Sequence, residues 1–364
     1  MYFDWYPYES FGLDVLSWVW MLLTLRFLSA ILDRWGDLIA IGFYWCMLFL
    51  LCVWQKLFFD TESFGSFFGM LRVLAWGMFF FGPWACAIVY RWHTDVGSKR
   101  IFMGLGVVLT LIGVDSFWVE PNLLTVTKYV VKDEKILQPK RIVLLADIQT
   151  DTINRQTRKA LQMAAGFTPD LLVYAGDYLQ HTFWKDYQVN IEPFNQLLFE
   201  YGLDKTPSIV VEGDAEYHWG NQWHALFEGT NATILDPSDR TLWGDIEIMG
   251  LTMMDSKYGE VLHRSNPKRF SILVGHNPNF ALEEPAADLY LAGHTHGGQV
   301  VLPFLGPLIT FSDLPNAQVA GRTDFPNGST LIVSQGIGME RYDAPRLRFL
   351  CPPELVVIDL IPMD

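Results

Sequence analysis

The chain has 364 residues, of which 51% are hydrophobic, with a net charge of −14 and a mean hydropathy of +0.19. This length accommodates two domains, and the apolar composition excludes a disordered chain, a collagen and a small disulfide scaffold. The acidic pI near 4.9 offers no basic face, so we expect no DNA or RNA partner.

Charge divides the chain into two unlike parts. The first 118 residues contain 16 charged side chains and ten of the 14 tryptophans, whereas the remaining 246 residues contain 50 charged side chains. We therefore expect a transmembrane domain over residues 1–118, a connector over 119–137 and a soluble domain over 138–364. The four cysteines form no zinc-type pair and say nothing about the redox compartment.

The first part contains four apolar stretches, each close to the roughly 20 residues that a membrane-spanning helix needs. We expect four transmembrane helices, near residues 13–33, 38–57, 65–90 and 100–118. The loops with Arg34 and with Arg91, Lys99 and Arg100 are the more basic ones, which orients them to the cytoplasm. This orientation predicts a multi-pass protein of the plasma (inner) membrane whose soluble domain lies on the outer or periplasmic side.

From residue 141 onward, short β-branched and leucine-rich runs alternate with helical stretches. Such runs are typical of strands covered on both faces, and they predict a layered α/β domain. We expect strands at residues 141–146, 170–175, 208–211, 246–249, 270–274, 288–291, 330–333 and 355–360, and an edge strand or linker over 130–140.

Five of these strands end in a potential metal ligand. A lone aspartate at a strand end is usually a cap or turn former, and a lone histidine is usually a packing residue. Five such ends in one domain instead predict one ligand crevice, because the carboxyl ends of strands line the crevice in layered α/β folds. The candidates are Asp147 and Gln149, then Asp177, then Asp214, then His276, and finally His294 and His296.

These blocks resemble the calcineurin-like metallophosphoesterases, whose pattern runs DxH, GDxx, GNH followed by an acid, GH and GHxH. The resemblance covers residues 138–362, and the block GHTHGGQ is its most specific part. It implies a four-layer αββα sandwich that hydrolyses a phosphodiester or pyrophosphate bond with a metal-activated hydroxide. The apolar stretches ahead of the domain resemble the membrane-anchored branch of the family, which suggests a lipid-linked substrate.

The resemblance also implies two divalent metal ions, Mn, Fe or Zn, that share one carboxylate. Carboxylates and imidazoles suit these ions, and a bridging carboxylate lets two cations sit roughly 3.5–4 Å apart. By analogy, the first metal would take Asp147, Gln149, the bridging Asp177 and His296, and the second would take Asp177, Asp214, His276 and His294.

Three positions depart from the family pattern. Gln149 replaces a histidine (DxQ for DxH), and because an amide is the poorer ligand, we expect the first metal site to be weak or empty. Asp214 replaces an asparagine and adds negative charge at the second metal. Ala215 replaces the histidine that assists the leaving oxygen (GDAE for GNHD), and loss of a general acid typically costs about 10²–10⁴ in rate. His181 and His218 are the candidates for a substitute proton donor.

Two hypotheses of different classes follow. In the first, the chain is an active phosphoesterase, and Arg341, Arg346 or Arg348 contacts a phosphate oxygen, although ion-paired or solvated arginines fit the sequence equally well. In the second, the departures at Gln149 and Ala215 mark a catalytically impaired pseudoenzyme, which serves as a structural or binding subunit of a membrane protein complex.

Overall fold

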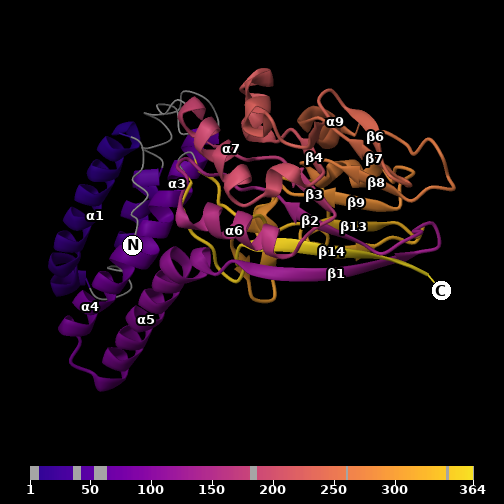
Figure 1. The fold of residues 1–364 in the computed structure, drawn as a ribbon. Helices are drawn as coiled ribbons and strands as arrows, with labels where there is room; N and C mark the ends of the chain where they lie inside the picture. Colours follow the sequence, from indigo (N-terminus) through magenta and orange to yellow (C-terminus); the bar gives the residue numbers. More distant parts are fainter. Residues whose placement is uncertain are drawn as a thin grey trace. The chain divides into compact units, whose positions relative to one another are not determined.

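The computed structural model describes residues 8–35, 42–52, 64–180, 187–259, 261–341 and 344–363. The chain divides into two compact units, the first mainly from residues up to Val119 and the second mainly from Glu120 onward. Figure 1 shows the helices of the first unit in indigo and purple, and the strands of the second unit in magenta to yellow.

The first unit is built from helices. A buried apolar cluster that includes Met21, Leu28, Leu48 and Val73 holds them together. The helical segments are α1 (Tyr8–Trp35), a helix at Gly42–Cys52, α3 (Phe64–Trp76), a π-helical turn at Gly77–Phe81, α4 (Gly82–Trp92), α5 (Val96–Val114) and a second π-helical turn at Asp115–Val119.

Within the described ranges, two helical stretches are long and apolar enough to cross a membrane, Phe67–Trp92 and Val96–Asn122. The apolar parts of the two preceding helices are shorter, at Val15–Leu28 and Gly42–Cys52. Arg26 interrupts the first of them, and the expected span at 38–57 extends beyond the described residues. The structure thus supports two of the four expected transmembrane helices, and the other two stay a prediction.

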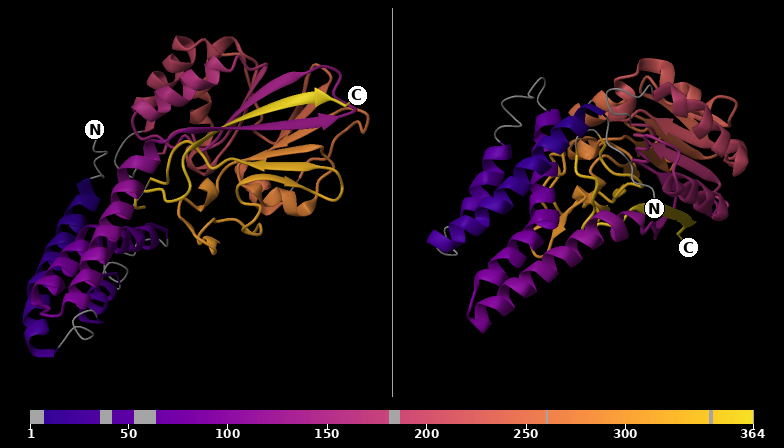
Figure 2. Two further views of the ribbon diagram at one scale, coloured as in Figure 1. Left: turned by 90° about the horizontal axis from the view of Figure 1, so that it is seen from below. Right: turned by 90° about the vertical axis from the view of Figure 1, so that its left-hand side faces the viewer.

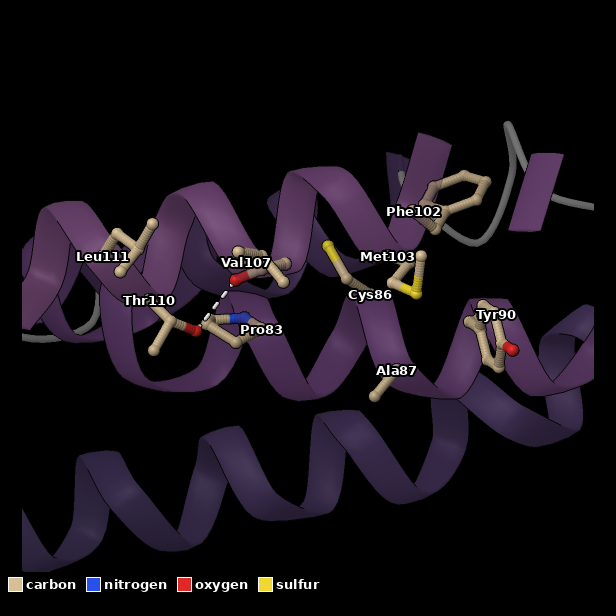
Figure 3. A pocket seen from close by; sticks show the side chains of 10 residues that line it. Pro83, Cys86, Ala87, Tyr90, Phe102, Met103, Val107, Thr110 and Leu111 are labelled. Atoms are coloured by element: carbon tan, nitrogen blue, oxygen red, sulfur yellow. Dashed lines mark hydrogen bonds between the residues drawn. The ribbon is translucent and has the colours of Figure 1, made fainter. Parts of the chain in front are cut away.

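Helices α4 and α5 leave an apolar groove along their contact (Figure 3). The Thr110 hydroxyl donates a hydrogen bond to Gly106 O of the same helix at 2.8 Å. The groove therefore offers few polar groups to a ligand. The groove is lined by Pro83, Cys86, Ala87, Tyr90, Phe102, Met103, Gly106, Val107, Thr110 and Leu111.

Two six-stranded mixed sheets form the second unit, and their strands fall into two layers (Figure 2). The first sheet has the order β1 (Thr125–Asp133), β14 (Glu354–Pro362), β2 (Lys140–Leu145), β3 (Leu171–Ala175), β4 (Ser208–Val211), β5 (Ala232–Ile234). The second has the order β12 (Gly321–Asp324), β13 (Thr330–Val333), β9 (Leu289–Ala292), β8 (Ser271–Val274), β7 (Ile246–Gly250), β6 (Asp239–Trp243).

Successive side chains of each strand point to opposite faces of its sheet, and this alternation produces the layers. In β2, Ile142 and Leu144 join an apolar cluster that includes Ile248 and Ile272 of the opposite sheet. Their neighbours Val143 and Leu145 join a second cluster, on the other face, with side chains of α6 (Arg155–Gly166) and α7 (Ile191–Glu200). A third cluster packs the outer face of the second sheet against the 3-10 helix Pro278–Glu283. The prediction of a layered α/β domain is confirmed.

The first sheet begins earlier than expected. Strand β1 lies inside the stretch predicted as a connector, and it pairs in parallel with β14 from Thr125↔Glu354 to Asp133↔Pro362. An edge strand exposes one row of side chains and therefore lacks the continuous apolar run that identified the central strands. Only Leu123 and Leu124 separate β1 from the helical stretch that ends at Asn122.

Candidate metal centre

The blocks that follow β2, β3, β4, β8 and β9 converge in the second unit. Among the described residues, two groups present ligand atoms that all lie within 4.8 Å of one another. The first consists of Asp147, Asp177 and His276, and the second of Asp214, His276 and His294. His276 belongs to both groups, so the side chains at these strand ends form one cluster.

His276 is fully buried and faces three carboxylates. Its Nδ1 lies 2.7 Å from Ala175 O, and since a carbonyl can only accept, Nδ1 carries the hydrogen. Its Nε2 points the other way, 3.5 Å from Asp177, 3.7 Å from Asp214 and 4.0 Å from Asp147. A histidine held by a carbonyl on one nitrogen, with the other directed at acidic groups, has the arrangement typical of a metal ligand.

His294 repeats this arrangement. Its Nε2 donates to Phe311 O at 3.0 Å, and its Nδ1 lies 2.7 Å from Asp214 Oδ2. His296 approaches the cluster from the same block, with Nε2 3.7 Å from Asp147 Oδ1. The three histidines therefore bring a ring nitrogen to the carboxylates.

Gln149 contacts the carboxylate that the family resemblance makes the bridge. Its Nε2 donates to Asp177 Oδ2 at 2.8 Å, while the backbone N–H of Ala215 donates to Asp177 Oδ1 at 2.8 Å. The Ala215 methyl group is buried at 3% exposure. Gln149 thus presents a donor to Asp177 here, and both oxygens of Asp177 accept hydrogen bonds.

The backbone at the centre is held in an unfavourable conformation. Five of the seven predicted ligands have positive φ angles: Asp147 (51°), Gln149 (37°), Asp177 (55°), His294 (72°) and His296 (49°). Non-glycine residues rarely adopt this region, and they do so mainly where surrounding structure enforces it, often at functional sites.

Burial and neighbouring charges shift the pKa values in opposite directions. Burial raises the pKa of Asp147 to about 6, although His276 opposes the rise. Burial also favours a higher pKa for Asp214, but the hydrogen bond and charge of His294 and the charge of His276 lower it to about 2. Burial lowers the pKa of His276, yet Asp177 and the other carboxylates raise it well above its ordinary value. The centre as a whole favours bound positive charge.

The donor set fits divalent metal ions. Within the described residues, the buried atoms Asp147 Oδ2 and His276 Nε2 have no hydrogen-bond partner, and an unsatisfied buried polar atom is costly. Carboxylate oxygens beside imidazole nitrogens are ligands that Mn, Fe and Zn accept. A cation between these groups would satisfy both atoms and offset the carboxylate charge.

The other predicted site residues lie elsewhere or have other contacts. His181 lies outside the described residues. His218 is exposed and packs edge-on against Tyr217, with ring centroids 5.6 Å apart. Arg341 is buried at 3% exposure and lies in Glu340–Arg346, a segment grouped with the first unit. None of these observations tests their proposed roles, which stay predictions.

Arg348 differs from the expectation of a substrate contact. Its guanidinium is fully buried and donates to backbone carbonyls, to Cys351 O at 2.9 Å, to Gln335 O at 2.9 Å and to Gly338 O at 3.1 Å. These contacts use its donors to hold the loop that precedes β14. Arg348 is therefore a structural residue, because a buried guanidinium must satisfy its donors within the protein.

Glu216 is not among the residues predicted from the sequence, yet it holds the backbone of two of the ligand blocks. This buried carboxylate accepts hydrogen bonds from Asp177 N at 2.8 Å, from Tyr178 N at 2.9 Å and from Gly213 N at 3.2 Å. Burial, together with the nearby Asp177 charge, raises the pKa of Glu216 to about 8. The acid that ends the GDAE block was the available signal, but its contacts with the backbone of Asp177 and Tyr178 come from tertiary structure.

Comparisons with known proteins agree with this geometry. Residues 140–298 match the family model described as calcineurin-like phosphoesterase. The chain is 30% identical over 267 residues to the uncharacterized metallophosphoesterase YkuE of Bacillus subtilis, covering 67% of this chain and 87% of that protein. It is 24% identical to the phosphodiesterase YaeI of Escherichia coli, covering 61% and 83%. It is 30% identical to the UDP-2,3-diacylglucosamine pyrophosphatase LpxG of Chlamydia trachomatis, covering 37% and 43%.

The chain belongs to the calcineurin-like phosphoesterase family. It is a metallophosphoesterase, and the family to which it belongs hydrolyses phosphoester bonds with the help of divalent metal ions.

Proposed function

We propose that this protein is a membrane-anchored metallophosphoesterase that hydrolyses a phosphodiester or pyrophosphate bond of a lipid-linked substrate. The observation that carries the proposal is the convergence of Asp147, Asp177 and His276, where two buried ligand atoms have no hydrogen-bond partner among the residues that the structure describes. The names of YaeI, a phosphodiesterase, and LpxG, a pyrophosphatase of a diacylated sugar nucleotide, support the bond and substrate classes.

The residues proposed to hold metal ions are those of the two predicted ligand sets. Divalent ions bound there supply Lewis-acid polarisation of the phosphoryl group and lower the pKa of water. The protein's own groups hold the ligands in place: Ala175 O and Phe311 O orient the rings of His276 and His294, and the Ala215 N–H and Gln149 amide orient Asp177.

The alanine at position 215 limits the kinds of phosphoester bond that the protein can hydrolyse. An alanine cannot protonate a leaving oxygen, so the protein favours substrates whose leaving group departs without a proton. A pyrophosphate bond and an activated diester meet this condition, because their leaving groups are weakly basic. An alkoxide leaving group would require a donor such as His181 or His218.

Membrane anchoring is the second part of the proposal. The stretches Phe67–Trp92 and Val96–Asn122 support it by length and composition. We retain the proposal of four transmembrane helices, with the phosphoesterase unit on the outer or periplasmic side. A site tethered at the bilayer meets lipid-linked substrates at a raised effective concentration.

The test is turnover of bis(p-nitrophenyl) phosphate by the full chain in detergent with Mn²⁺. We expect metal-dependent turnover that Asp177→Ala abolishes, whereas Asp239→Ala, a change at an exposed aspartate of β6, leaves it unchanged. If Mn²⁺, Fe²⁺ and Zn²⁺ all give no turnover above the Asp177→Ala control, the hydrolase proposal fails. The impaired structural subunit would then be the better account.

A further inference from the structure

We propose that an apolar hairpin beside the metal centre inserts into the surface of a lipid bilayer and so brings lipid-linked substrate to the site. The apolar hairpin is residues 301–311, which comprise β10 (Val301–Leu302), the turn at 303–305, β11 (Gly306–Pro307) and the loop segment 308–311. The inference rests on the proposed function, because it gives that function its route to the substrate.

The apolar hairpin exposes large hydrophobic side chains without any charge. Phe304 is fully exposed, and Leu305 and Leu308 are 68% and 63% exposed. The eleven residues from Val301 to Phe311 contain no Asp, Glu, Lys, Arg or His. Single exposed apolar residues are ordinary, but a contiguous patch of this kind on a protein surface marks an interaction site.

The exposed side chains belong to a hairpin whose backbone is held by strand pairing and hydrogen bonds. Val301 pairs with Pro307 and Leu302 with Gly306, and Val301 N donates to Phe349 O at 2.9 Å. Asn316 Nδ2 also donates to Pro307 O at 3.1 Å. Because these contacts hold the base and return strand, the tip at Phe304 and Leu305 projects as a preformed wedge.

The apolar hairpin is directly connected to the proposed metal ligands. Its last residue, Phe311, supplies the carbonyl that accepts from His294 Nε2 at 3.0 Å. At its return strand, a Cβ at Gly298 would lie 2.4 Å from Pro307 Cβ, so the hairpin packs tightly against the GHTHGGQ block. Insertion of the tip would therefore place the centre close to lipid headgroups.

The connection between the two units indicates that the partner of the apolar hairpin is a lipid bilayer. The membrane-length stretch Val96–Asn122 ends three residues before β1 begins at Thr125. Two intervening residues, Leu123 and Leu124, span only about 7 Å, which keeps the phosphoesterase unit at the surface of any membrane that holds this stretch. Apolar and aromatic side chains are the type that partitions into the membrane interface.

Photocrosslinking tests the contact without any need for activity. Phe304→p-benzoylphenylalanine is prepared in the full chain and reconstituted into nanodiscs of phosphatidylcholine and phosphatidylglycerol. The matched control carries the same group at Phe199, which is 46% exposed on α7. We expect lipid adducts at position 304 at least tenfold above those at position 199. Equal lipid labelling, or labelling of protein alone, would overturn the proposal.

Turnover of a soluble probe and a lipid-embedded probe tests whether the apolar hairpin helps the site reach lipid substrates. The double variant Phe304→Asp and Leu305→Asp is compared with Phe199→Asp on two probes, soluble bis(p-nitrophenyl) phosphate and phosphatidyl-p-nitrophenol incorporated in the nanodisc. We expect the double variant to keep soluble turnover within twofold and to lose at least tenfold on the lipid probe. Equal loss on both probes, or no loss on the lipid probe, would contradict membrane docking. Absence of turnover in the parent protein would instead defeat the proposed function, and the crosslinking result would still decide the docking.

Discussion

Gln149 occupies one position of the proposed first metal set and makes a hydrogen bond there. Where the family pattern has an imidazole nitrogen, this chain has an amide whose Nε2 donates to Asp177 Oδ2 at 2.8 Å. The amide therefore stabilises the carboxylate by a hydrogen bond and adds no nitrogen ligand to the first metal set. Asp147 and His296, whose atoms Oδ1 and Nε2 lie 3.7 Å apart, then form a smaller donor set on that side.

Replacing Gln149 by histidine should strengthen the first metal site. We expect Gln149→His to raise affinity for Mn²⁺ or Zn²⁺ at least tenfold, the lower end of what a single group at a metal site contributes. The measurement is metal bound per chain after dialysis against a graded chelator, read by elemental analysis. Gln149→Ala is the matched control, since it removes the hydrogen bond and adds no ligand. Equal metal content in the two variants would contradict the assignment of Gln149 to a metal position.

At the scale of elements, the centre depends on sharp turns at strand ends. β3 ends at Ala175, and Gly176 follows with φ of +86° before Asp177. A Cβ at Gly176 would lie 2.6 Å from His276 Nδ1 and 2.7 Å from the Gly213 Cα. The missing side chain thus lets two strand ends and one proposed ligand approach one another, which explains the glycine before the aspartate.

Gly176→Ala should therefore damage both stability and metal binding. The left-handed backbone alone costs an alanine about 1–3 kcal/mol, and a fall in melting temperature of about 2–4 °C per kcal/mol is usual for domains of this size. We expect a lower melting temperature and weaker metal binding, because the His276 ring must move. Gly166→Ala is the control: among the described residues, no atom beyond the chain neighbours and the backbone of the helix itself lies within 4 Å of that Cβ position at the end of α6. Scanning fluorimetry with and without Mn²⁺ measures both effects, and equal melting temperatures in the two variants would refute the argument.

At the scale of the whole molecule, an apolar helical unit and an acidic phosphoesterase unit share one chain. The two membrane-length stretches and the two shorter apolar helices all precede β1. Either two or four spans is an even number. An even number returns the chain to the side from which it started.

This parity predicts that the N-terminus and the phosphoesterase unit lie on the same side of the membrane. We expect epitope tags at the two chain ends to be cleaved together by protease in one vesicle orientation and protected together in the other. The protein should also stay in the vesicle membrane during extraction with alkaline carbonate, because about 20 apolar residues suffice to span the bilayer. Cleavage of the tags from opposite sides would indicate an odd number of spans and would refute the four-span proposal.

Sequence alone determined the class of the molecule and most of its proposed centre. Each strand is a short local run, and each proposed ligand follows its strand directly, so the order of Asp147, Asp177, His276 and His294 is readable along the chain. The α/β layers follow from the same runs, because buried strands require cover on both faces.

Only the tertiary structure decided which groups touch. β1 pairs with a strand near the other end of the chain, Glu216 supports Asp177 from a different loop, and Arg348 turns inward to backbone carbonyls. The exposure of Phe304 likewise could not be predicted from the sequence, because apolar residues usually lie in the core. These features depend on contacts between distant segments, and local periodicity and composition carry no information on such contacts.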